Sequence, residues 1–507
     1  MNDNAKTLIA VLIAAGLASA AWLTAPKPRA AAQFSDVGQL LSPSLTDPLA
    51  AKSLEIISFD QNTASFSAFK VEFNGKQWVI PSHYSYPADA ETKMAQAASA
   101  FVGLHKESVV SDSPADHAAL GVLAPDDDTA PLEGRGTRVV IRDTNGAVLS
   151  EIILGRDVPD EPNAQAPSNK RYVRLAGSNR VYTTTLTGSV STRFTDWIET
   201  DPLRAATGAD ILEVASNRYR IDDKTGSTTD HQRVELTRPM TDAGVPGVWA
   251  LNAEPGGPPG PDQEINPARA DRLLNALNSI KIVGVRPKPA NLANILAGTA
   301  APGANINAAD MLSLQSRGFY LTERNSLVSS QGTLSVGRSD GVRYTLMFGE
   351  VAPGAGLELS AGLDAPDKQP DAAPESATHR YLFVTAAFDE SLLPPAPTPP
   401  TPPAASTPTE PAPEGSAENE DKPAEDAEYA AAKAAYDSTL AEREEKIKQG
   451  KKAADDLAKR FSPWYYVIDA SSFDALRPTR DELLTLKSSN APGVPQPTPV
   501  MPVPPGE

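Results

Sequence analysis

Five histidines are the residues of this chain best suited to bind a metal or to move protons near neutral pH. They are His83, His105, His117, His231 and His379. None stands in a His-x-x-x-His or His-Glu-x-x-His arrangement, which would place two ring nitrogens on one side of a helix for a zinc ion. His105 and His117 are near enough in sequence to converge, but positions at the surface or at helix ends explain them better. The sequence therefore predicts no metal site.

Three other short motifs resemble chemical sites. Asp126–Asp128 lacks the alternating spacing and the closing Glu of a calcium loop, so we interpret it as a solvated turn. Ser335 lacks the first Gly of a Gly-x-Ser-x-Gly nucleophile motif and falls within a predicted strand. Asp222–Ser227 contains the Asp-Lys-Thr-Gly phosphorylation sequence of P-type ATPases, but those pumps need many membrane helices, and we interpret it as a polar turn. We therefore predict no catalytic residue, no cofactor and no enzymatic activity.

The composition excludes several classes of function. The chain has 507 residues, no cysteine and a formal net charge of -18. Without cysteine there can be no disulfide, thiolate metal site or cysteine nucleophile. The negative charge, and the lack of a basic patch with interleaved aromatic residues, exclude nucleic acid as a partner. The 47 prolines indicate long stretches that do not pack into a core.

The segment Thr7–Ala25 carries no charged side chain and is typical of a membrane-embedded helix. At about 1.5 Å per residue it would span about 28 Å, close to the thickness of a hydrocarbon core. A signal peptide would be cleaved after the small residues Ala18–Ala20, but the apolar run continues past them and favours an uncleaved anchor. Short-range counting of Lys and Arg slightly opposes export, whereas a short N-terminus before a large polar body favours it. We expect a single-pass protein of the cytoplasmic membrane with its bulk extracytoplasmic, in the periplasm.

Two stretches nearly two hundred residues apart follow one pattern. Gly136–Arg156 and Gly332–Glu350 both open with Gly-Thr, alternate apolar and polar residues around a polar-Gly turn, and close on an apolar run. In both halves this hairpin follows an earlier hairpin with a Trp, a helix and a short second helix. An Arg-Phe-x-x-Trp sequence ends both halves, at Arg193–Trp197 and Arg460–Trp464. We therefore predict an α+β protein with two copies of one module of antiparallel sheet plus helices.

One main helix is predicted in each copy. In the first it lies within 88–104, with Asp89 as its N-cap, and in the second within 266–285, with Asn266 as its N-cap. The apolar residues at helical spacing are Met94, Ala98, Phe101, Leu273, Leu274 and Leu277.

An insertion interrupts the second copy before its last element. A run rich in Pro, Ala and Thr begins at Leu392 and is expected to be extended polyproline II, and an acidic stretch follows it. Glu428–Phe461 is predicted to be a helix, interrupted by Gly450. Its thin apolar stripe fits a solvated spacer helix or, alternatively, a coiled-coil surface for a partner or for self-association. The ion pairs expected along it are Glu442–Lys446, Glu444–Lys448 and Asp455–Lys459.

The predicted boundaries are 1–30 for the anchor, 50–206 for the first module, 207–391 and 460–485 for the second, 392–427 for a disordered insertion, 428–461 for the helix and 486–507 for a disordered tail.

Four tryptophans fall at corresponding places in the two copies. They are Trp78, Trp197, Trp249 and Trp464. Residues repeated in this way usually pack in the core of a module. Because domain interfaces also favour ligand grooves, a site between the two modules stays open as an alternative.

This pattern resembles the bacterial envelope family described as domain of unknown function 4340 (DUF4340). The resemblance covers Leu54–Pro202 well and the second copy loosely, and it departs from the family at Leu120, where the family often has Tyr or Phe. It implies a single-span membrane protein linked to an ABC-type transporter of the gliding-motility class, and it carries over no catalytic residue. The motifs that carry it are the strand with Trp78 and the helix after it, Ala118–Val122, Val139–Gly155 and Arg171–Leu186.

The function that this combination favours is a membrane-tethered extracytoplasmic scaffold or accessory subunit of an ABC-transporter-like envelope complex. Its partners would be the membrane, through Thr7–Ala25, and permease or ATPase subunits. The alternative is an extracytoplasmic hydrolase or glycan-binding protein with its site between the two modules. A third hypothesis is a purely structural envelope spacer.

Overall fold

The fold is described by a computed structural model, which leaves the predicted membrane segment Thr7–Ala25 outside the residues it describes. Among the helices of the described part of the chain, none combines the length and the apolar character that crossing a membrane requires. The described residues are 36–61, 64–159, 169–188, 190–203, 210–222, 225, 227–240, 245–252, 259–322, 326–354, 356–362, 379–402 and 422–487.

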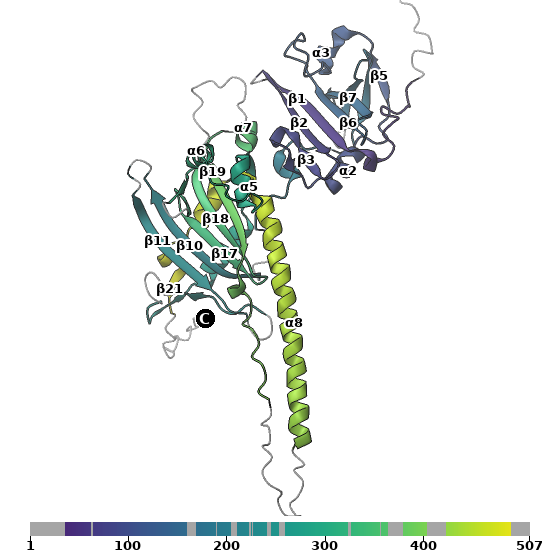
Figure 1. Ribbon diagram of the computed structural model, residues 1–507. Coiled ribbons are helices and arrows are strands. Elements are labelled where there is room, and N and C mark those ends of the chain that lie inside the picture. Colours follow the sequence, from purple (N-terminus) through teal and green to yellow (C-terminus); the bar gives the residue numbers. More distant parts are fainter. Residues whose placement is uncertain are drawn as a thin grey trace, which may run out of the picture. The chain divides into compact units, whose positions relative to one another are not determined.

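The chain divides into two compact units. The first unit comprises Met1–Val79 and Asp89–Thr192, and the second comprises Ile80–Ala88 and Arg193–Glu507. Each unit contains one large sheet of antiparallel strands with helices packed on it (Figure 1). The predicted mixture of antiparallel sheets and helices is therefore confirmed.

The sheet of the first unit has the strand order β3-β2-β1-β6-β7-β8-β9-β5. The residues of the two-residue strand β4 belong to the second unit. Its hairpins form where short polar-Gly sequences allow a left-handed backbone. Gly75 has a φ of +90°, and the Asn74 side chain accepts hydrogen bonds from the backbone of Lys76 and Gln77. The strands are β1 (Ser53–Asp60), β2 (Ser65–Phe73), β3 (Trp78–Ile80), β4 (Tyr86–Pro87), β5 (Ser108–Ser111), β6 (Thr137–Arg142), β7 (Val148–Asp157), β8 (Lys170–Leu175) and β9 (Val181–Thr185).

The helices of the first unit largely follow the sequence pattern. Helix α2 (Glu91–Ser99) buries Met94 and Ala98 as predicted. Asp89, however, is not its N-cap, because Ala90 takes that position and the Asp89 carboxylate instead pairs with Lys93 at 3.2 Å. The short 3-10 helix η2 (Pro48–Ala50) packs against α2, and η4 (Pro114–Asp116) leads into α3 (His117–Leu120).

The sheet of the second unit has the order β12-β11-β10-β17-β18-β19-β20-β14. Its helices include α4 (Pro267–Asn278), which begins after Asn266 and buries the three predicted leucines, although no side-chain hydrogen bond caps it. The strands are β10 (Ile211–Ile221), β11 (Thr228–Thr237), β12 (Ala250–Leu251), β14 (Ile282–Pro287), β17 (Thr333–Arg338), β18 (Val342–Ala352), β19 (His379–Phe388) and β20 (Trp464–Ile468). Two small strand pairs are β13 (Gln263–Ile265) with β21 (Leu484–Leu486) and β15 (Phe319–Leu321) with β16 (Leu327–Ser329). The other elements are η3 (Pro81–His83), η5 (Phe194–Trp197), η7 (Glu390–Leu392), α5 (Ala290–Leu296), α6 (Ala308–Gln315), α7 (Gly356–Ala361), α8 (Lys422–Phe461), α9 (Ala470–Ala475) and α10 (Arg480–Leu483).

The two sheets have the same strand order. Strands β3, β2, β1, β6, β7, β8, β9 and β5 of the first sheet correspond, position by position, to β12, β11, β10, β17, β18, β19, β20 and β14 of the second. The main helix also follows the first hairpin in both units, as α2 and as α4. This shared order supports the two-copy architecture, which stays a prediction.

One of the predicted correspondences is wrong in detail. Trp464 begins β20, which occupies the place of β9, whereas Phe194–Trp197 form the 3-10 helix η5. The two Arg-Phe-x-x-Trp sequences are therefore not equivalent elements. The reason is the inserted helix α8, which ends at Phe461, so that the residues following it must enter the sheet as a strand.

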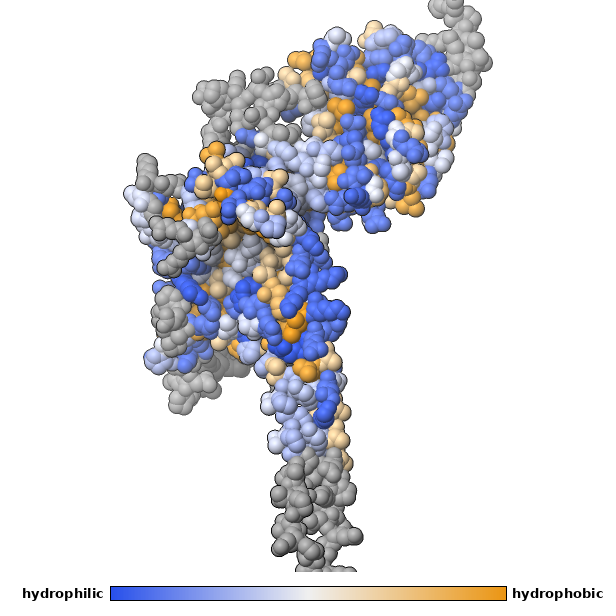
Figure 2. Space-filling view, in the orientation of Figure 1, coloured by the Kyte–Doolittle hydropathy of each residue, from blue (hydrophilic) through white to orange (hydrophobic). Residues whose placement is uncertain are grey.

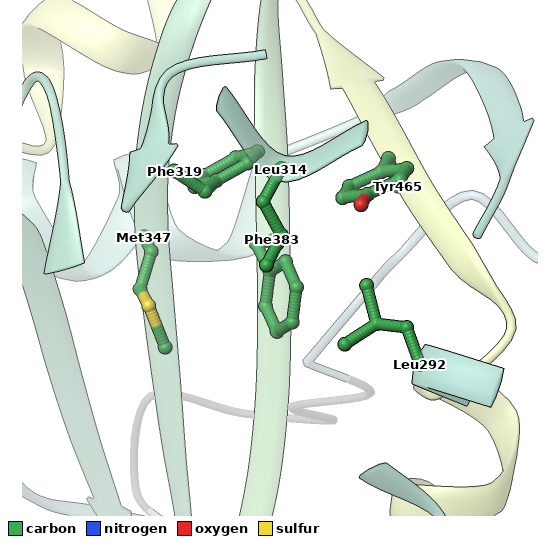
Figure 3. Packing of buried hydrophobic residues seen from close by; sticks show 6 residues of the cluster. All are labelled: Leu292, Leu314, Phe319, Met347, Phe383 and Tyr465. Atoms are coloured by element: carbon green, nitrogen blue, oxygen red, sulfur yellow. The ribbon is translucent and has the colours of Figure 1, made fainter. Parts of the chain in front are cut away.

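A hydrophobic cluster covers one face of the second sheet. Met347 and Phe383 are paired neighbours on β18 and β19, and the rings of Phe319 and Tyr465 stack at 5.9 Å (Figure 3). Leu314 from α6 is 1% exposed and packs into this cluster with Leu292. Helices α5 and α6 thus hold that face of the sheet.

Replacing Leu314 with Ala should therefore lower the free energy of unfolding of the second unit by about 2–5 kcal/mol, because the cluster cannot close around the missing side chain. The matched control is Leu312→Ala in the same helix, where the side chain is 68% exposed. Denaturant titration of the two variants checks this. Equal effects of both changes would contradict the packing described for α6.

Candidate functional site: the anchored long helix

Two of the histidines identified in the sequence, His83 and His117, are held by contacts that support the fold. His83 is buried, its Nε2 lies 2.9 Å from the Ser360 hydroxyl, and its ring stacks on Phe194 at 4.2 Å. Burial, together with the positive charge of Arg286, lowers the pKa of His83 to about 4, so the ring is neutral at physiological pH. His117 Nε2 lies 2.8 Å from the carbonyl of Asn179. Within the described residues, no three His, Asp or Glu side chains form a group that could hold a metal ion.

The other candidate motifs lie in turns and strands. Asp126 pairs with Arg138 at 2.7 Å, and Asp127 accepts hydrogen bonds from the backbone and hydroxyl of Thr129, which lower the pKa of its carboxyl. Ser335 is in the middle of β17. Asp222 accepts a hydrogen bond from Thr225 in the turn between β10 and β11. None of these arrangements activates a nucleophile or a proton donor.

The four tryptophans are also packing residues, each in contact with side chains close to it. Trp78 lies 5.5 Å from the Phe73 ring, Trp249 lies under the Arg238 guanidinium at 4.4 Å, and Trp464 meets Tyr86 edge-on at 5.0 Å. Trp197 is buried in η5. Their contacts are those of packing residues.

The feature that sequence reasoning underestimated is the fixing of helix α8 to the second sheet. The helix has 40 residues, and its C-terminal part packs on β18, β19 and β20 (Figure 1). Its last residue, Phe461, is 1% exposed and meets the rings of Tyr344 and Tyr466. Just before it, Arg460 donates to the carbonyls of Glu199 and Asp201.

A buried lysine hydrogen-bonds the C-terminal carbonyl of α8. Lys288, directly after β14, donates from Nζ to the Phe461 carbonyl at 3.0 Å, which would otherwise lack a helical partner. The ammonium lies 3.9 Å from the centroid of the Phe383 ring and 5.2 Å from that of Tyr465. Burial holds the pKa of Lys288 well below its usual value. No described carboxylate pairs with it, so its polar and aromatic partners are the Phe461 carbonyl and the two rings.

The cavity beside Lys288 is too small for a metabolite. Its volume is about 30 Å³, whereas pockets for small-molecule ligands have volumes of about 300–1,000 Å³. It is lined by Leu296, Phe383, Ala458 and Phe461, among others. The structure therefore favours an anchoring role for Lys288 over a catalytic one.

Gly450, which the sequence suggested as an interruption, is a contact point of α8. A Cβ at this position would clash with the backbone carbonyl of Asp340 and would lie 2.7 Å from the Phe388 ring. Gly450 is buried. The glycine therefore lets the helix approach the turn between β17 and β18 closely, and the helix continues through it without a break.

The less exposed positions of α8 recur every three or four residues, which is the spacing of a coiled-coil seam. They continue beyond Gly450 through Ile447, Arg443, Leu440 and Tyr436. We call residues 428–445 of α8 the arm. Figure 1 shows the arm extending past the end of the second sheet, and Figure 2 shows strongly hydrophilic residues beside the sheet and a mixture of weakly hydrophilic and weakly hydrophobic residues farther along.

The extended segment 393–402 begins beside the arm. The Arg443 guanidinium donates to the Pro394 carbonyl at 3.1 Å and pairs with Glu390 at 2.7 Å. In this segment Pro397 and Pro400 are half-buried, and most of their neighbours are exposed. Three residues make one turn of polyproline II, so these two prolines share one side.

The ion pairs predicted along α8 are not those that form. Within the described helix, Lys433 pairs with Asp437 at 2.9 Å and Lys448 with Glu445 at 3.8 Å. The predicted pairs of Glu442, Glu444 and Asp455 are absent among the described residues. Long exposed side chains have several partners within reach, so spacing alone does not select one.

A comparison with known protein families matches one part of the chain. Residues 78–295 match the family model described as Domain of unknown function (DUF4340). The resemblance to DUF4340 is thereby confirmed over this range, which runs from β3 through most of α5. Helix α8 lies outside it. No curated protein and no solved structure matches the chain.

Gly450→Ala should destabilise the second unit by about 1–3 kcal/mol through overpacking. In an exposed helix the same change would stabilise by up to about 1 kcal/mol, so the sign of the effect is diagnostic. Gln449→Ala, one residue earlier and exposed, is the control. A stabilised Gly450→Ala variant in denaturant titration would show that the helix does not contact Phe388.

Lys288 should make the stability of the protein pH-dependent. Because burial lowers its pKa in the folded state, the folded protein bears the cost of a buried charge below that pKa, and the cost is relieved as the pH rises toward 10.5. The unfolding free energy of the wild type should therefore rise with pH relative to Lys288→Met, and level off above about 10.5.

The control for this measurement is Lys281→Met, which removes the same charge from an exposed position beside the same strand. Its difference from the wild type should be nearly constant with pH. A flat difference for Lys288→Met between about pH 6 and pH 10 would mean that Lys288 is not desolvated.

Proposed function

We propose that this chain is a membrane-tethered extracytoplasmic scaffold or accessory subunit of an ABC-transporter-like envelope complex, without catalytic activity. The observation that carries the proposal is the anchored helix α8. Lys288 hydrogen-bonds its last residue, Arg460 ties the same end to the loop at Glu199 and Asp201, and the arm extends past the sheet. A rigid helix fixed at one end is suited to present a contact surface to another protein. The DUF4340 match over residues 78–295 is consistent with this proposal.

The charge of the arm indicates the kind of partner. Residues 428–445 contain five acids, Glu428, Asp437, Glu442, Glu444 and Glu445, against the two bases Lys433 and Arg443, a net charge of -3. Two arms side by side would repel each other. The complementary partner is a helix with a basic face, belonging to a different protein, and self-association through α8 is the less favoured outcome.

The shared strand order of the two sheets also belongs to this proposal. We infer that the second unit is a copy of the first, into which the segment 392–461 was inserted between the strands equivalent to β8 and β9. Duplication provides two sheets, and the insertion provides one arm. The alternative of a hydrolase or glycan-binding protein with a site between the two modules stays a prediction from the sequence.

Placing a photo-crosslinking phenylalanine analogue at Tyr436 should yield an adduct with one membrane protein when the full chain is irradiated in its own membranes. The same analogue at Leu312, which is 68% exposed on α6, is the control and should not yield that adduct. Mass spectrometry identifies the partner. A permease or ATPase subunit of an ABC-type transporter would support the proposal.

Three outcomes would count against it. An adduct with a second copy of the chain would replace the accessory role by self-association. Equal adducts from Tyr436 and Leu312 would show unspecific capture. No adduct at Tyr436, with the protein folded and in the membrane fraction, would exclude the arm as the contact.

A further inference from the structure

Four arginines gather on one face of the second sheet. Arg218 and Arg220 are two residues apart on β10. The pairing with β11 shifts register between them, but the extra residue lies on β11, where Asp230 has a φ of +55°, so the alternation of β10 continues and both arginines point to the same side. Paired residues share a face, and pairing runs from Ser216 of β10 through β17 to Leu346 of β18. This places both arginines on the face of Leu346 and Phe348.

The third and fourth arginines reach the same face from other elements. Arg380 alternates with Leu382 on β19, and Leu382 pairs with Phe348. Arg477 follows α9, whose Phe473 packs edge-on against Phe348 with ring centroids 5.2 Å apart. The topology thus brings residues 218, 220 and 380 close enough to Arg477 for their charges to act on it.

Phe473 orders two of these side chains. The guanidinium carbons of Arg380 and Arg477 lie 4.4 Å and 4.5 Å from the centroid of its ring. Phe473 is itself buried, with 4% exposure. Cation–π contacts with a fixed ring reduce the freedom of both arginines, so less entropy is lost when they bind a ligand.

The positive charge of the cluster is not neutralised by ion pairs. None of the four arginines pairs with a carboxylate of the described residues. Arg380 donates to the carbonyl of Gly349 at 3.4 Å and Arg477 to that of Tyr219 at 3.3 Å. The buried Nε of Arg477 has no hydrogen-bond partner.

The groups around the cluster leave an excess of positive charge. Glu350 of β18 and Asp474 of α9 attract Arg380 from a distance, and Glu482 of α10 is drawn to Arg218 and to Arg269 of α4. The balance is five arginines against three carboxylates, 5 - 3 = 2 positive charges. Burial, followed by the repulsion from Arg218, Arg380 and Arg220, lowers the pKa of Arg477 to about 10. Arg477 is therefore still charged at neutral pH, in a chain that is strongly negative overall.

We propose that Arg218, Arg220, Arg380 and Arg477 form a binding site for a phosphate group. Guanidinium forks match the geometry of phosphate oxygens, and the negative charge of a phosphate group offsets the excess positive charge of the cluster. Arg220 is exposed and gives access from solvent, whereas the other three are half-buried and supply the desolvated donors. The group comes from a free phosphate or from the headgroup of a phospholipid.

Isothermal titration calorimetry of the full chain in detergent, at low ionic strength, tests this site with two probes. Inorganic phosphate represents the free ion, and glycerophosphoglycerol represents a lipid headgroup without its acyl chains. The wild type should bind at least one of them saturably, with an affinity that falls as chloride is added. Saturation by phosphate alone would identify the free ion as the source, and saturation by glycerophosphoglycerol alone would identify the headgroup.

The variants Arg220→Gln and Arg380→Gln should each weaken binding tenfold or more. Arg220 is exposed, so this variant tests the site even where Arg380→Gln fails to fold. Arg272→Gln is the matched control, because it removes one exposed positive charge from α4 of the same unit, where Arg272 donates only within its own helix. Its affinity should stay within about twofold of the wild type. Binding of neither probe, or an equal loss in Arg220→Gln and Arg272→Gln, would overturn the proposal.

Discussion

The hydrogen bond from Lys288 to the Phe461 carbonyl is the interaction on which the second unit depends, because it supplies a donor to the last carbonyl of a long helix whose end is buried against the sheet. The last carbonyls of any helix lack partners along the chain, and a helix end that is buried must find them elsewhere. Here the Nζ of Lys288 supplies the donor, two aromatic rings lie beside it, and the chain continues at once into the fully buried strand β20. The end of helix α8 and the start of strand β20 are therefore fixed by the same contacts.

This constraint explains how the second sheet accommodates a large insertion. Strand β20 pairs with β19 and with β14, and Lys288 stands directly after β14. The same few residues thus hold the helix, the returning strand and the edge strand in place. In the first sheet, β8 and β9 occupy the equivalent positions and are joined by a short turn. The inserted chain is tolerated because both of its ends lie where neighbouring strands would meet in any case.

Sequence reasoning succeeded where a local pattern decides the structure. The alternating strands, the Asn74-Gly75 turn and the buried faces of α2 and α4 follow from side-chain periodicity and turn chemistry. It failed at Asp89, where a lysine one turn later competes for the carboxylate. It could not find Lys288 or the four arginines, because each is an ordinary basic residue in its own segment. Only the strand order brings Arg218 to Arg380 and Arg477, across more than two hundred and fifty residues of chain.

The two groups of buried or half-buried cations differ in a way that separates support of the fold from binding. Lys288 has a carbonyl and two rings as partners, and the cavity beside it is far smaller than a ligand pocket, so its surroundings are complete within the chain. The arginine cluster has an ordered ring and two carbonyl acceptors, yet it keeps mutual repulsion and a buried N–H without a partner. A fold gains nothing from bringing like charges together. Where a structure retains such repulsion beside an accessible surface, a complementary anion is the simplest physical reason for it.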